Sequence, residues 1–557
     1  MQNKIKSKAH ITFCFFALLT GILVMGSAIA EPVKLWDKPT GGSDRDEGYG
    51  VAVDSDNNII VVGVTESFAR SSGDEDEDMW LIKYTLARSS EDRDGDIWLI
   101  KYTPDGTVLW NKTAGGVYMD EGYGVAVDSN NNIIITGSIS YGDYGDSFFL
   151  GQYYSQFLKE GKVHDGLIKA FEDNNITLSK DAKITKRSDN VREITDGKMI
   201  YEVHVFNDKR LHIHALRNSD MLTIKYDSSG NMLWNKTVDR NAWDYGKSVA
   251  IDSSNNIIVA GHAPLGLGEI GGLIIKYDTQ GNMLWNKTAG KSSSDELYSI
   301  AVDSNNNIIA AGFMRYSDIG NVWVIKYDSN GNMLWYKTAS MGGWDRGYGI
   351  AVDSSNNIIV TGSANIRYSG RKVCVLTMKY DSFGNLLWNK TASGIHNSFD
   401  SGKSVAVDSN DNIIVVGYTE RIKAIENYEI VVLENATYYA VEGIESFYYT
   451  EPPVKRNYEL WTIKYDPSGN VIWNKTEGGI DRDMGFGVAI DQNNNIIITG
   501  ETNSFGAGKG DVWVIKYTGD MERQKQDMNI YLITGALILI LILLIIMMIR
   551  RNKKTMK

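Results

Sequence analysis

The most regular pattern in the chain is a pair of short apolar runs, rich in Val and Ile, separated by a polar Asp/Asn cluster. The first copy, residues 51–63, reads Val-Ala-Val-Asp-Ser-Asp-Asn-Asn-Ile-Ile-Val-Val-Gly. Apolar runs this short, joined by residues suited to tight turns, predict a β-hairpin. Further copies with conservative changes occupy 125–137, 249–261, 300–312, 350–362, 405–417 and 488–500. Seven copies of one hairpin indicate a repeat architecture.

Two more apolar segments follow each hairpin. The third strand ends in Ile-Lys-Tyr or Met-Lys-Tyr, at 98–102, 222–226, 273–277, 323–327, 376–380, 461–465 and 513–517. A turn such as 227–231 follows, with Gly and Asn suited to positive φ. The fourth strand is close to Leu-Trp-Asn-Lys-Thr, with its tryptophan at Trp110, Trp234, Trp285, Trp335, Trp388 and Trp473. Four strands in a unit of about 50 residues predict a propeller blade, whose stacked sheets explain the continuously apolar hairpin strands.

The two ends of the repeat array complement each other. Six units carry all four strands, but the unit that begins at 488 has only three. The missing strand lies at the other end of the array, at Val33–Lys38. We expect it to pair beside 513–517 and to close a seven-bladed ring, because an open sheet edge invites aggregation.

The segment Gly-Val-Ala-Val-Asp-Ser-x-Asn-Asn-Ile-Ile-Val-x-Gly, followed by Ile-Lys-Tyr-Asp-x-x-Gly-Asn, resembles the NHL-type and SBBP-type β-propeller repeats of bacterial and archaeal cell-surface proteins. The resemblance covers seven units of about 50 residues each. It implies that the Val-Ala-Val-Asp strand is innermost at the channel and that the Leu-Trp-Asn-Lys-Thr strand is outermost. It also implies scaffolding and binding, since only some propellers are enzymes.

Both ends of the chain carry targeting signals. Residues 1–30 combine a basic start, an apolar run and Ala28-Ile29-Ala30, which predicts a cleaved signal peptide; an uncleaved anchor helix is the alternative. Residues 530–549 hold no charge and are long enough for a transmembrane helix. The basic tail at 550–557 is then cytoplasmic. The sequence therefore predicts a single-pass cell-membrane protein whose propeller, 31–520, lies outside the cell.

Composition narrows the choice of partners. The net charge of −12 argues against nucleic acid, which requires basic patches. Cys374 is the one cysteine in 31–520, so no intrachain disulfide is expected there. Nucleophile elbows, Gly-rich phosphate loops and zinc-protease motifs are missing from the sequence, and we expect no cofactor.

Three units are expanded between their second and third strands. The first carries a tandem copy of the third strand at 71–85, the second an insertion at 139–220, and the sixth an insertion at 418–459. In the second insertion, helical spacing over 152–174 predicts a helix with Gly161 as a weak point. Alternation at 182–187, 191–195, 199–206 and 210–216 predicts a β-meander, giving a small α+β subdomain. The fold class is therefore all-β: a seven-bladed propeller of four-stranded blades with an α+β insertion and one transmembrane helix.

In the resembled topology, loops between the second and third strands emerge on the same face as the loops between blades. All three insertions should therefore crowd one face. Because loops on a rigid scaffold commonly carry binding, this face is the expected recognition surface.

One aspartate stands eight residues before each hairpin aspartate. These loop aspartates are Asp46, Asp120, Asp244, Asp295, Asp345, Asp400 and Asp483. A ring of carboxylates near the channel mouth is a candidate site for cations or positive ligands. The alternative is that each accepts backbone N–H bonds in a tight turn, which the identical repetition favours.

Other candidate sites are weaker. The hairpin cluster that begins at Asp128 resembles the start of a calcium loop but has Ile139 at the twelfth position, so an Asx-type turn is preferred. His204, His212 and His214 form a metal site only if a three-residue turn at 208–210 sets His204 opposite His214. Asn-x-Thr sequons predict glycosylation best at Asn175 and Asn435, in insertions, and also at Asn111, Asn235, Asn286, Asn389 and Asn474.

These observations predict a membrane-anchored extracellular propeller that acts as a binding, adhesion or envelope scaffold for an extracellular protein or glycan. The alternative is an extracellular propeller enzyme, a lyase or hydrolase, with its site on the insertion-bearing face. An active site would require unlike polar residues from different blades to converge there.

Overall fold

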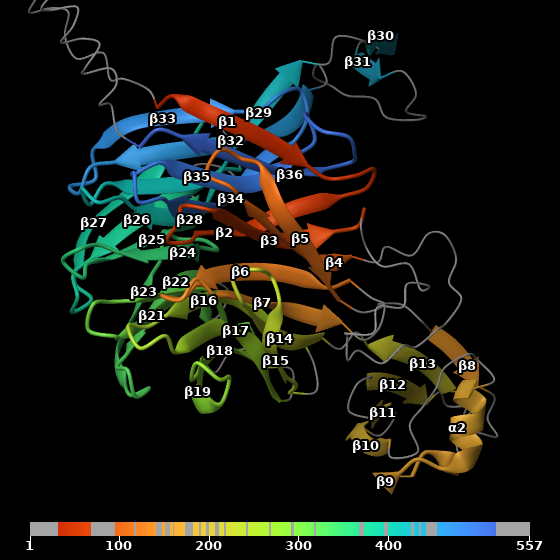
Figure 1. Ribbon diagram of the computed structural model, residues 1–557. Helices are drawn as coiled ribbons and strands as arrows, with labels where there is room; N and C mark the ends of the chain where they lie inside the picture. Colours follow the sequence, from red (N-terminus) through yellow and green to blue (C-terminus); the bar gives the residue numbers. More distant parts are fainter. Residues whose placement is uncertain are drawn as a thin grey trace, which may run out of the picture.

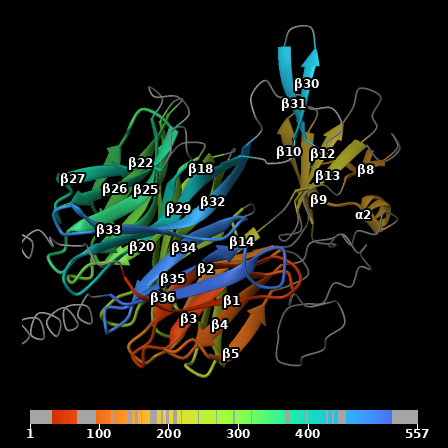
Figure 2. The same ribbon diagram turned by 90° about the horizontal axis from the view of Figure 1, so that it is seen from above.

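The computed structural model describes residues 32–67, 95–115, 119–140, 147–150, 156–159, 161–172, 182–188, 191–195, 200–205, 211–216, 219–240, 243–266, 269–290, 294–316, 319–366, 372–394, 399–424, 428–433, 436–441 and 454–519. Seven four-stranded antiparallel sheets surround a central channel (Figures 1 and 2). The first strands of neighbouring blades contact one another around the ring, which makes the Val-Ala-Val-Asp strand innermost. The predicted seven-bladed, all-β propeller is confirmed.

The strands of each blade run from the channel outward. Blade 1 consists of β2 (Asp46–Val53), β3 (Ile59–Thr65), β4 (Asp96–Tyr102) and β5 (Val108–Ala114). Blade 2 consists of β6 (Glu121–Val127), β7 (Ile133–Ser140), β14 (Ser219–Tyr226) and β15 (Met232–Val238). Blade 3 consists of β16 (Tyr245–Ile251), β17 (Ile257–Gly266), β18 (Glu269–Tyr277) and β19 (Met283–Ala289). Blade 4 consists of β20 (Glu296–Val302), β21 (Ile308–Tyr316), β22 (Ile319–Tyr327) and β23 (Met333–Ala339). Blade 5 consists of β24 (Arg346–Val352), β25 (Ile358–Ile366), β26 (Lys372–Tyr380) and β27 (Leu386–Ala392). Blade 6 is β28 (Ser401–Val407), β29 (Ile413–Ala424), β32 (Val454–Tyr465) and β33 (Val471–Glu477).

Blade 7 closes the ring with strands from both ends of the array. Its inner strands are β34 (Asp483–Ile490), β35 (Ile496–Thr502) and β36 (Asp511–Tyr517), and its outer strand is β1 (Lys34–Thr40). β1 pairs antiparallel with β36, from Lys34 opposite Tyr517 to Thr40 opposite Val512. The exchange of strands predicted from the incomplete last unit is therefore observed, and it leaves no blade with an unpaired third strand.

The core lies between blades. Ile60 and Val62 of blade 1 pack in one cluster with Ile133 and Ile135 of blade 2, and all four are buried. Each sheet is thus covered on both faces, which is why its second and third strands are apolar at consecutive positions.

A buried lysine joins each hairpin turn to the next blade. In blade 1, Asp54 Oδ1 accepts hydrogen bonds from the amides of Asp56 and Asn58, an Asx-type turn that holds Asn57 at a φ of 61°. Lys101 Nζ lies 2.9 Å from Asp54 Oδ2 and also donates to the Ser228 carbonyl of blade 2. Equivalent pairs occur in every blade: Lys225–Asp128, Lys276–Asp252, Lys326–Asp303, Lys379–Asp353, Lys464–Asp408 and Lys516–Asp491.

The tryptophan of the fourth strand completes this junction. Trp285 Nε1 donates to the Ser329 carbonyl, which also accepts a hydrogen bond from Lys276 Nζ. Gly331 of that turn has a φ of 80°, and a Cβ added there would lie 3.1 Å from the Trp285 ring. The turn glycine is therefore required both by its backbone conformation and by the close approach of the ring.

The insertion in blade 2 forms its own sheet beside the propeller (Figure 1). Its elements are β8 (Ser147–Leu150), β9 (Gly161–Lys162), α2 (Asp165–Glu172), β10 (Lys183–Ser188), β11 (Val191–Thr195), β12 (Ile200–Val205) and β13 (Leu211–Leu216). The meander strands are found at the predicted segments, but the helix is shorter than predicted. Gly161 and Lys162 pair with β10 as a strand, so the helix begins only at Asp165.

The insertion in blade 6 lengthens β29 and β32 into a long hairpin and adds the pair β30 (Tyr428–Leu433) and β31 (Ala436–Val441). The tandem third-strand copy at 71–85 lies outside the described residues, as do the predicted signal peptide and the predicted membrane span at 530–549. Among the residues that are described, no helix has the length and apolarity needed to cross a membrane.

Candidate functional site

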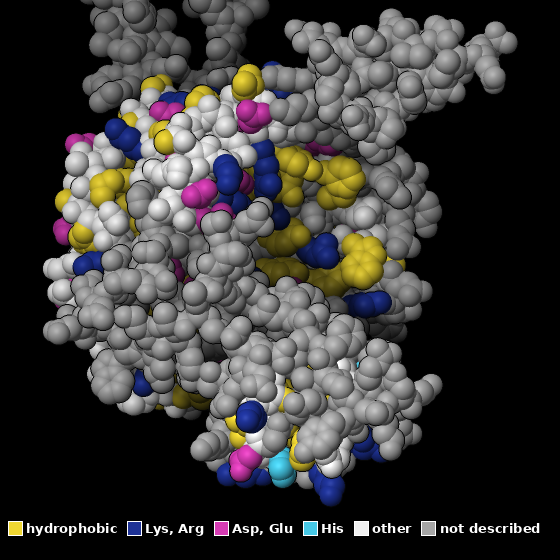
Figure 3. All heavy atoms as spheres, turned by 90° about the vertical axis from the view of Figure 1, so that its right-hand side faces the viewer, with side chains coloured by type: hydrophobic (Ala, Val, Ile, Leu, Met, Phe, Trp, Pro, Cys, Tyr) yellow, Lys and Arg dark blue, Asp and Glu magenta, His cyan; other side chains and the backbone are white. Residues whose placement is uncertain are grey.

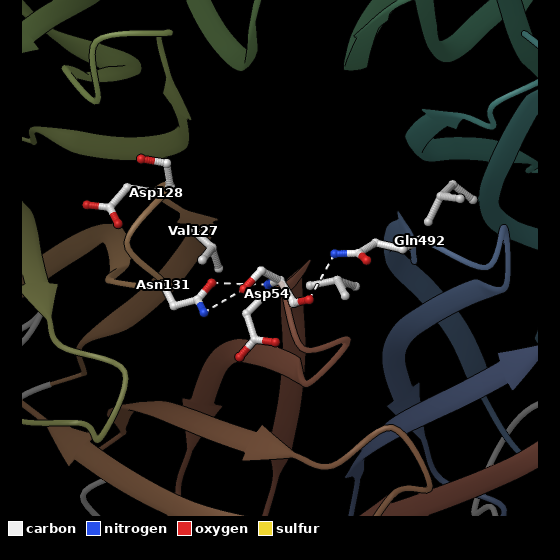
Figure 4. Close-up of a pocket in the computed structure, with 9 residues that line it drawn as sticks. Asp54, Val127, Asp128, Asn131 and Gln492 are labelled. Carbon is white, nitrogen blue, oxygen red and sulfur yellow. Dashed lines mark hydrogen bonds between the residues drawn. The ribbon is translucent and has the colours of Figure 1, made fainter.

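The two ends of the channel differ in chemistry. We call the end with the hairpin turns the hairpin side and the end from which the insertions emerge the insertion side. On the hairpin side, Asn131 Oδ1 accepts from the Ser55 amide, Asn131 Nδ2 donates to Ser55 Oγ, and Gln492 Nε2 donates to the Ser55 carbonyl (Figure 4). In each of the following turns, a side-chain oxygen accepts a hydrogen bond from a backbone amide in the turn of the preceding blade. The accepting residues are Asn255, Asn306, Asn356, Asp411 and Asn494, and Asn57 of blade 1 accepts from blade 7, which completes the ring. A cavity of about 260 Å³ lies here, and its polar lining is engaged in this ring.

The loop aspartates lie on the insertion side, just before or at the start of the innermost strands, and all seven are buried. Asp400 is representative: Oδ2 accepts from the Gly394 amide, and Oδ1 accepts from Thr419 Oγ1 and the Glu420 amide. Backbone amides also donate to the carboxylates of Asp46, Asp120, Asp244, Asp295, Asp345 and Asp483. Each carboxylate thus fastens the loop before the strand or the end of the second strand. Cation binding by this ring stays a prediction.

Asp244 differs from the other loop aspartates. Its Oδ2 accepts from the Arg240 amide at 2.7 Å, but Oδ1 has no hydrogen-bond partner. Burial, together with the nearby charge of Asp220, raises the pKa of Asp244 to about 7.

A β-bulge follows each loop aspartate. The pairing of β2 with β3 skips Tyr49, because Gly48 lies opposite Gly63 and Gly50 lies opposite Val62. A bulge leaves its extra residue out of the ladder and re-aims the side chain. The same register shift occurs in all seven innermost strands. The seven bulged residues, which we call the collar, are Tyr49, Tyr123, Lys247, Tyr298, Tyr348, Lys403 and Phe486.

The glycine that ends each hairpin motif belongs to this bulge. A Cβ on Gly63 would lie 1.8 Å from the Glu47 carbonyl oxygen, and one on Gly362 would lie 1.8 Å from the Arg346 carbonyl oxygen. No side chain fits in that space. The glycine is therefore fixed by the same backbone geometry that presents the collar.

Collar side chains from successive blades contact one another around the channel. The ring of Tyr49 lies 5.4 Å from that of Tyr123 and 5.5 Å from that of Phe486. Lys247 Nζ lies 3.4 Å from the centre of the Tyr123 ring. On the other side of the channel, Tyr348 lies 5.2 Å from Tyr298, and Lys403 Nζ lies 3.9 Å from the Tyr348 ring. Both lysines stand at distances typical of cation–π contacts.

A second set of unlike residues lies immediately beyond the collar. We call this set the rim: the residue that follows each loop aspartate, namely Glu47, Glu121, Tyr245, Glu296, Arg346, Ser401 and Met484. By register, their partners on the second strands are Val64, Ser138, His262, Phe313, Ser363, Tyr418 and Glu501. Figure 3, which faces the insertion side, shows hydrophobic and basic side chains gathered beside one another there. Collar and rim together form the mouth of the channel.

Carboxylates dominate the mouth at blades 7, 1 and 2. Tyr49 Oη donates to Glu47, and Tyr123 Oη donates to Glu121. Arg45 pairs with Glu47, and Arg482 Nη2 lies 3.5 Å from Glu501. Burial, together with the neighbouring Glu47 carboxylate, raises the pKa of Glu501 to about 7. The Glu501 carboxyl group can therefore hold a proton near neutral pH.

The mouth at blades 4 to 6 holds cations and aromatic rings, with Glu296 of blade 4 as its rim carboxylate. The Arg346 guanidinium lies 4.9 Å from the Phe313 ring, which stacks on Trp344 at 5.5 Å. Burial lowers the pKa of Lys403 to about 8, and the charges of Arg346 and Arg482 act in the same direction. Burial also lowers the pKa of Lys247 to about 8, but there Glu121 and Glu296 oppose the shift.

The histidines of the insertion do not take the register that sets His204 opposite His214. His204 pairs with His212, and Glu202 pairs with His214. The three-residue turn required His214 opposite His204, so the observed register differs from the predicted one by two residues. The described residues contain no group of three metal-ligating side chains. The side chains of His212 and His214 lie outside that description, so metal binding by this trio stays a prediction.

Five sequon asparagines lie exposed on the outermost strands: Asn111, Asn235, Asn286, Asn389 and Asn474. Asn175 and Asn435 lie outside the described residues. Glycosylation at all seven stays a prediction.

Sequence reasoning placed the recognition face on the insertion side but missed the collar and the rim. A position-by-position comparison of the repeats would have found them. The residues one and three places after the loop aspartate vary from blade to blade, whereas most of their neighbours stay Gly, Ser, Val or Ile.

No family model matches the chain. A segment is 23% identical over 232 residues to Uncharacterized WD repeat-containing protein L264 of Acanthamoeba polyphaga mimivirus, covering 38% of this chain and 14% of that protein. The chain thus spans a small part of that relative's length.

Similar solved structures include Sqt1 of Chaetomium thermophilum, with 8% identity, a TM-score of 0.37, and coverage of 88% of this chain and 98% of that one. They also include the polysaccharide lyase Uly1, with 9% identity, a TM-score of 0.38, and coverage of 85% and 90%. The sheet topology establishes the seven-bladed propeller, and the comparisons add only that part of the chain is similar to a WD-repeat-containing protein.

Proposed function

We propose that the protein is a membrane-anchored extracellular scaffold that binds a protein or glycan partner at the mouth of its propeller. The observation that carries this proposal is the distribution of variation among the repeats. The hairpin side repeats the Asp–Lys pair in every blade and the Asn contact in all but one, where Asp411 takes its place, whereas collar and rim bring Glu, Tyr, Arg, Lys and Phe from different blades to one place. A site that recognises one ligand requires unlike groups converging in this way.

The course of the chain supports an outward orientation of the mouth. The Thr518 amide donates to the Val33 carbonyl, and Lys464 Nζ donates to the Gly519 carbonyl, so the described chain ends on the hairpin side. Residues 520–529 separate this point from the apolar segment at 530–549. Ten extended residues span at most roughly 36 Å. A helix at 530–549 would hold the hairpin side near the bilayer and turn the mouth away from it.

Binding of the full-length protein to glycan and protein arrays tests this proposal. Trp344→Ala, on the mouth, should remove the array signal, because it deletes an aromatic ring that stacks on Phe313 and lies 5.6 Å from the Arg315 guanidinium. Leu284→Ser is the matched control, since Leu284 is exposed on an outermost strand near the hairpin side. Equal loss in both variants, or no bound ligand on either array, would overturn the proposal.

A second candidate function is extracellular hydrolysis or elimination on a bound glycan. The pair Glu47 and Glu501 favours it, because a carboxyl group with a pKa of about 7 can act as a general acid or base at neutral pH. New reducing ends released from array-positive glycans by the wild type, but not by Glu501→Gln, would identify an enzyme. Intact glycans after prolonged incubation would leave binding as the function.

A further inference from the structure

Lys403 is the collar residue whose charge is least compensated. It lies on the bulge of β28, with Nζ 3.9 Å from the ring of Tyr348 and 5.4 Å from the ring of Tyr418. Among the residues that the structure describes, no carboxylate forms an ion pair with it. The charges that act on it most are those of Arg346 and Arg482, on the blades to either side.

The other collar lysine provides an internal comparison. Lys247 occupies the same repeat position on β16 and lies over the ring of Tyr123. Its charge is partly balanced by Glu121 and Glu296, on the blades to either side. The two lysines therefore share backbone geometry and aromatic contact but differ in the sign of the charges around them.

An ammonium group withdrawn from water among other cations is unfavourable unless an anion joins it. One carboxylate placed between Lys403 and Arg346 would neutralise part of this charge and accept charge-assisted hydrogen bonds from both. We propose that Lys403 and Arg346 form a subsite for the carboxylate of an acidic sugar residue, an inference that rests on the proposed function of the mouth.

Two features favour a sugar over an acidic peptide. The rings of Tyr348 and Tyr418 lie beside Lys403 and the ring of Phe313 lies beside Arg346, and the C–H face of a pyranose packs on such rings. Across the channel, the carboxylates of Glu47 and Glu121 accept hydrogen bonds from tyrosine hydroxyls, and sugar hydroxyls can donate to the same acceptors. A carboxylate side chain of Asp or Glu carries no hydroxyl for those acceptors.

Isothermal titration of the full-length protein with oligogalacturonate tests this subsite. The fully methyl-esterified oligomer is the matched ligand, because it keeps the sugar rings and loses the negative charge. We expect the acid form to bind at least tenfold more tightly, and Lys403→Gln to remove most of that difference. Lys247→Gln should change affinity less than about threefold, since its site already holds carboxylates. Lys403→Arg should restore binding, and thermal unfolding of each variant checks its fold.

Each other outcome has a defined meaning. Equal affinity for acid and ester forms, or equal losses in Lys403→Gln and Lys247→Gln, would overturn the subsite. Tighter binding of an oligoglutamate peptide than of oligogalacturonate would replace the sugar with an acidic peptide and also overturn it. If array binding remains sensitive to Trp344→Ala while oligogalacturonate does not bind, only the subsite fails. If Trp344→Ala leaves the array signal unchanged, the proposed function fails as well.

Discussion

Removal of the Lys326 ammonium tests whether the buried pairs between hairpin turn and third strand hold the ring together. Lys326 Nζ lies 2.8 Å from Asp303 Oδ2, and the two side chains are 4% and 1% exposed. The same ammonium donates to the Ser382 carbonyl of blade 5. Lys326→Met would leave the Asp303 carboxylate buried without its counter-charge and would cut one link between blades.

The expected loss follows from this geometry. Breaking a buried ion pair by removing one partner costs about 3–5 kcal/mol, a large fraction of the stability of a typical domain. Asp303 keeps hydrogen bonds from the Asn305 and Asn307 amides, which places the expected loss near the lower end, at about 3 kcal/mol. In the double variant Asp303→Asn/Lys326→Met the stranded charge is gone, so its loss should be smaller than the sum of the single losses.

Urea unfolding followed by tryptophan fluorescence measures these free energies, since Trp323 and Trp335 lie in the same blade. Lys509→Met is the control. Lys509 also pairs with an aspartate, Asp44, at 3.3 Å, but its side chain is 78% exposed, so its loss should stay below about 1 kcal/mol. A loss in Lys326→Met as small as in Lys509→Met, or strictly additive losses in the cycle, would refute the reasoning.

Three further predictions concern other parts of the ring. Burial alone would raise the pKa of Asp303, but hydrogen bonds from Lys326 and from the Asp303 turn outweigh burial and lower that pKa. The stability that ionised Asp303 contributes should therefore be lost as the pH falls below about 4. Unfolding temperatures at pH 3 and pH 6 measure this loss, and equal temperatures would contradict it. Asp244→Asn should raise the unfolding temperature at pH 8 and leave it unchanged at pH 4. The pKa of this carboxyl group is raised from 3.8 to about 7, so its ionisation in the folded protein costs up to ~4 kcal/mol of stability. A lower unfolding temperature of the variant at pH 8 would contradict this prediction. Gly331→Ala should lower the free energy of unfolding by roughly 1–2 kcal/mol, because φ is 80° and the added Cβ would lie 3.1 Å from the Trp285 ring. An unchanged urea midpoint would contradict it.

The blade architecture could be predicted because its determinants are local and repeated. An apolar run, an Asp/Asn turn and a second apolar run specify a hairpin without reference to the rest of the chain. The closing strand was predictable for a different reason: one unit lacked a strand, and Val33–Lys38 matched the missing segment.

The mouth could not be predicted in the same way, because a bulge breaks the alternation on which strand assignments rest. In a regular strand Tyr49 and Val51 would share a face, and Tyr49 would belong to the packing between sheets. The bulge between Gly48 and Gly50 removes Tyr49 from that pattern. Long-range contacts within a blade add a second difficulty, since Asp54 and Lys101 lie far apart in the sequence and meet only after the third strand of the blade is in place.

Freedom from packing does not by itself explain the composition of the mouth. If collar and rim varied only because nothing constrains them, uncharged polar residues such as Ser401 would suffice, and any charges would be expected to pair. Instead Glu501, Glu47 and Glu121 lie at blades 7, 1 and 2, with Glu296 on blade 4, and Lys403 is subject to the charges of Arg346 and Arg482 with no ion-pair partner among the described residues. Such an arrangement lowers stability, because desolvated like charges repel one another. A local departure from the rules that the other positions obey is typical of a functional site, and it identifies the cationic side of the mouth as the part of this propeller that is shaped by a ligand.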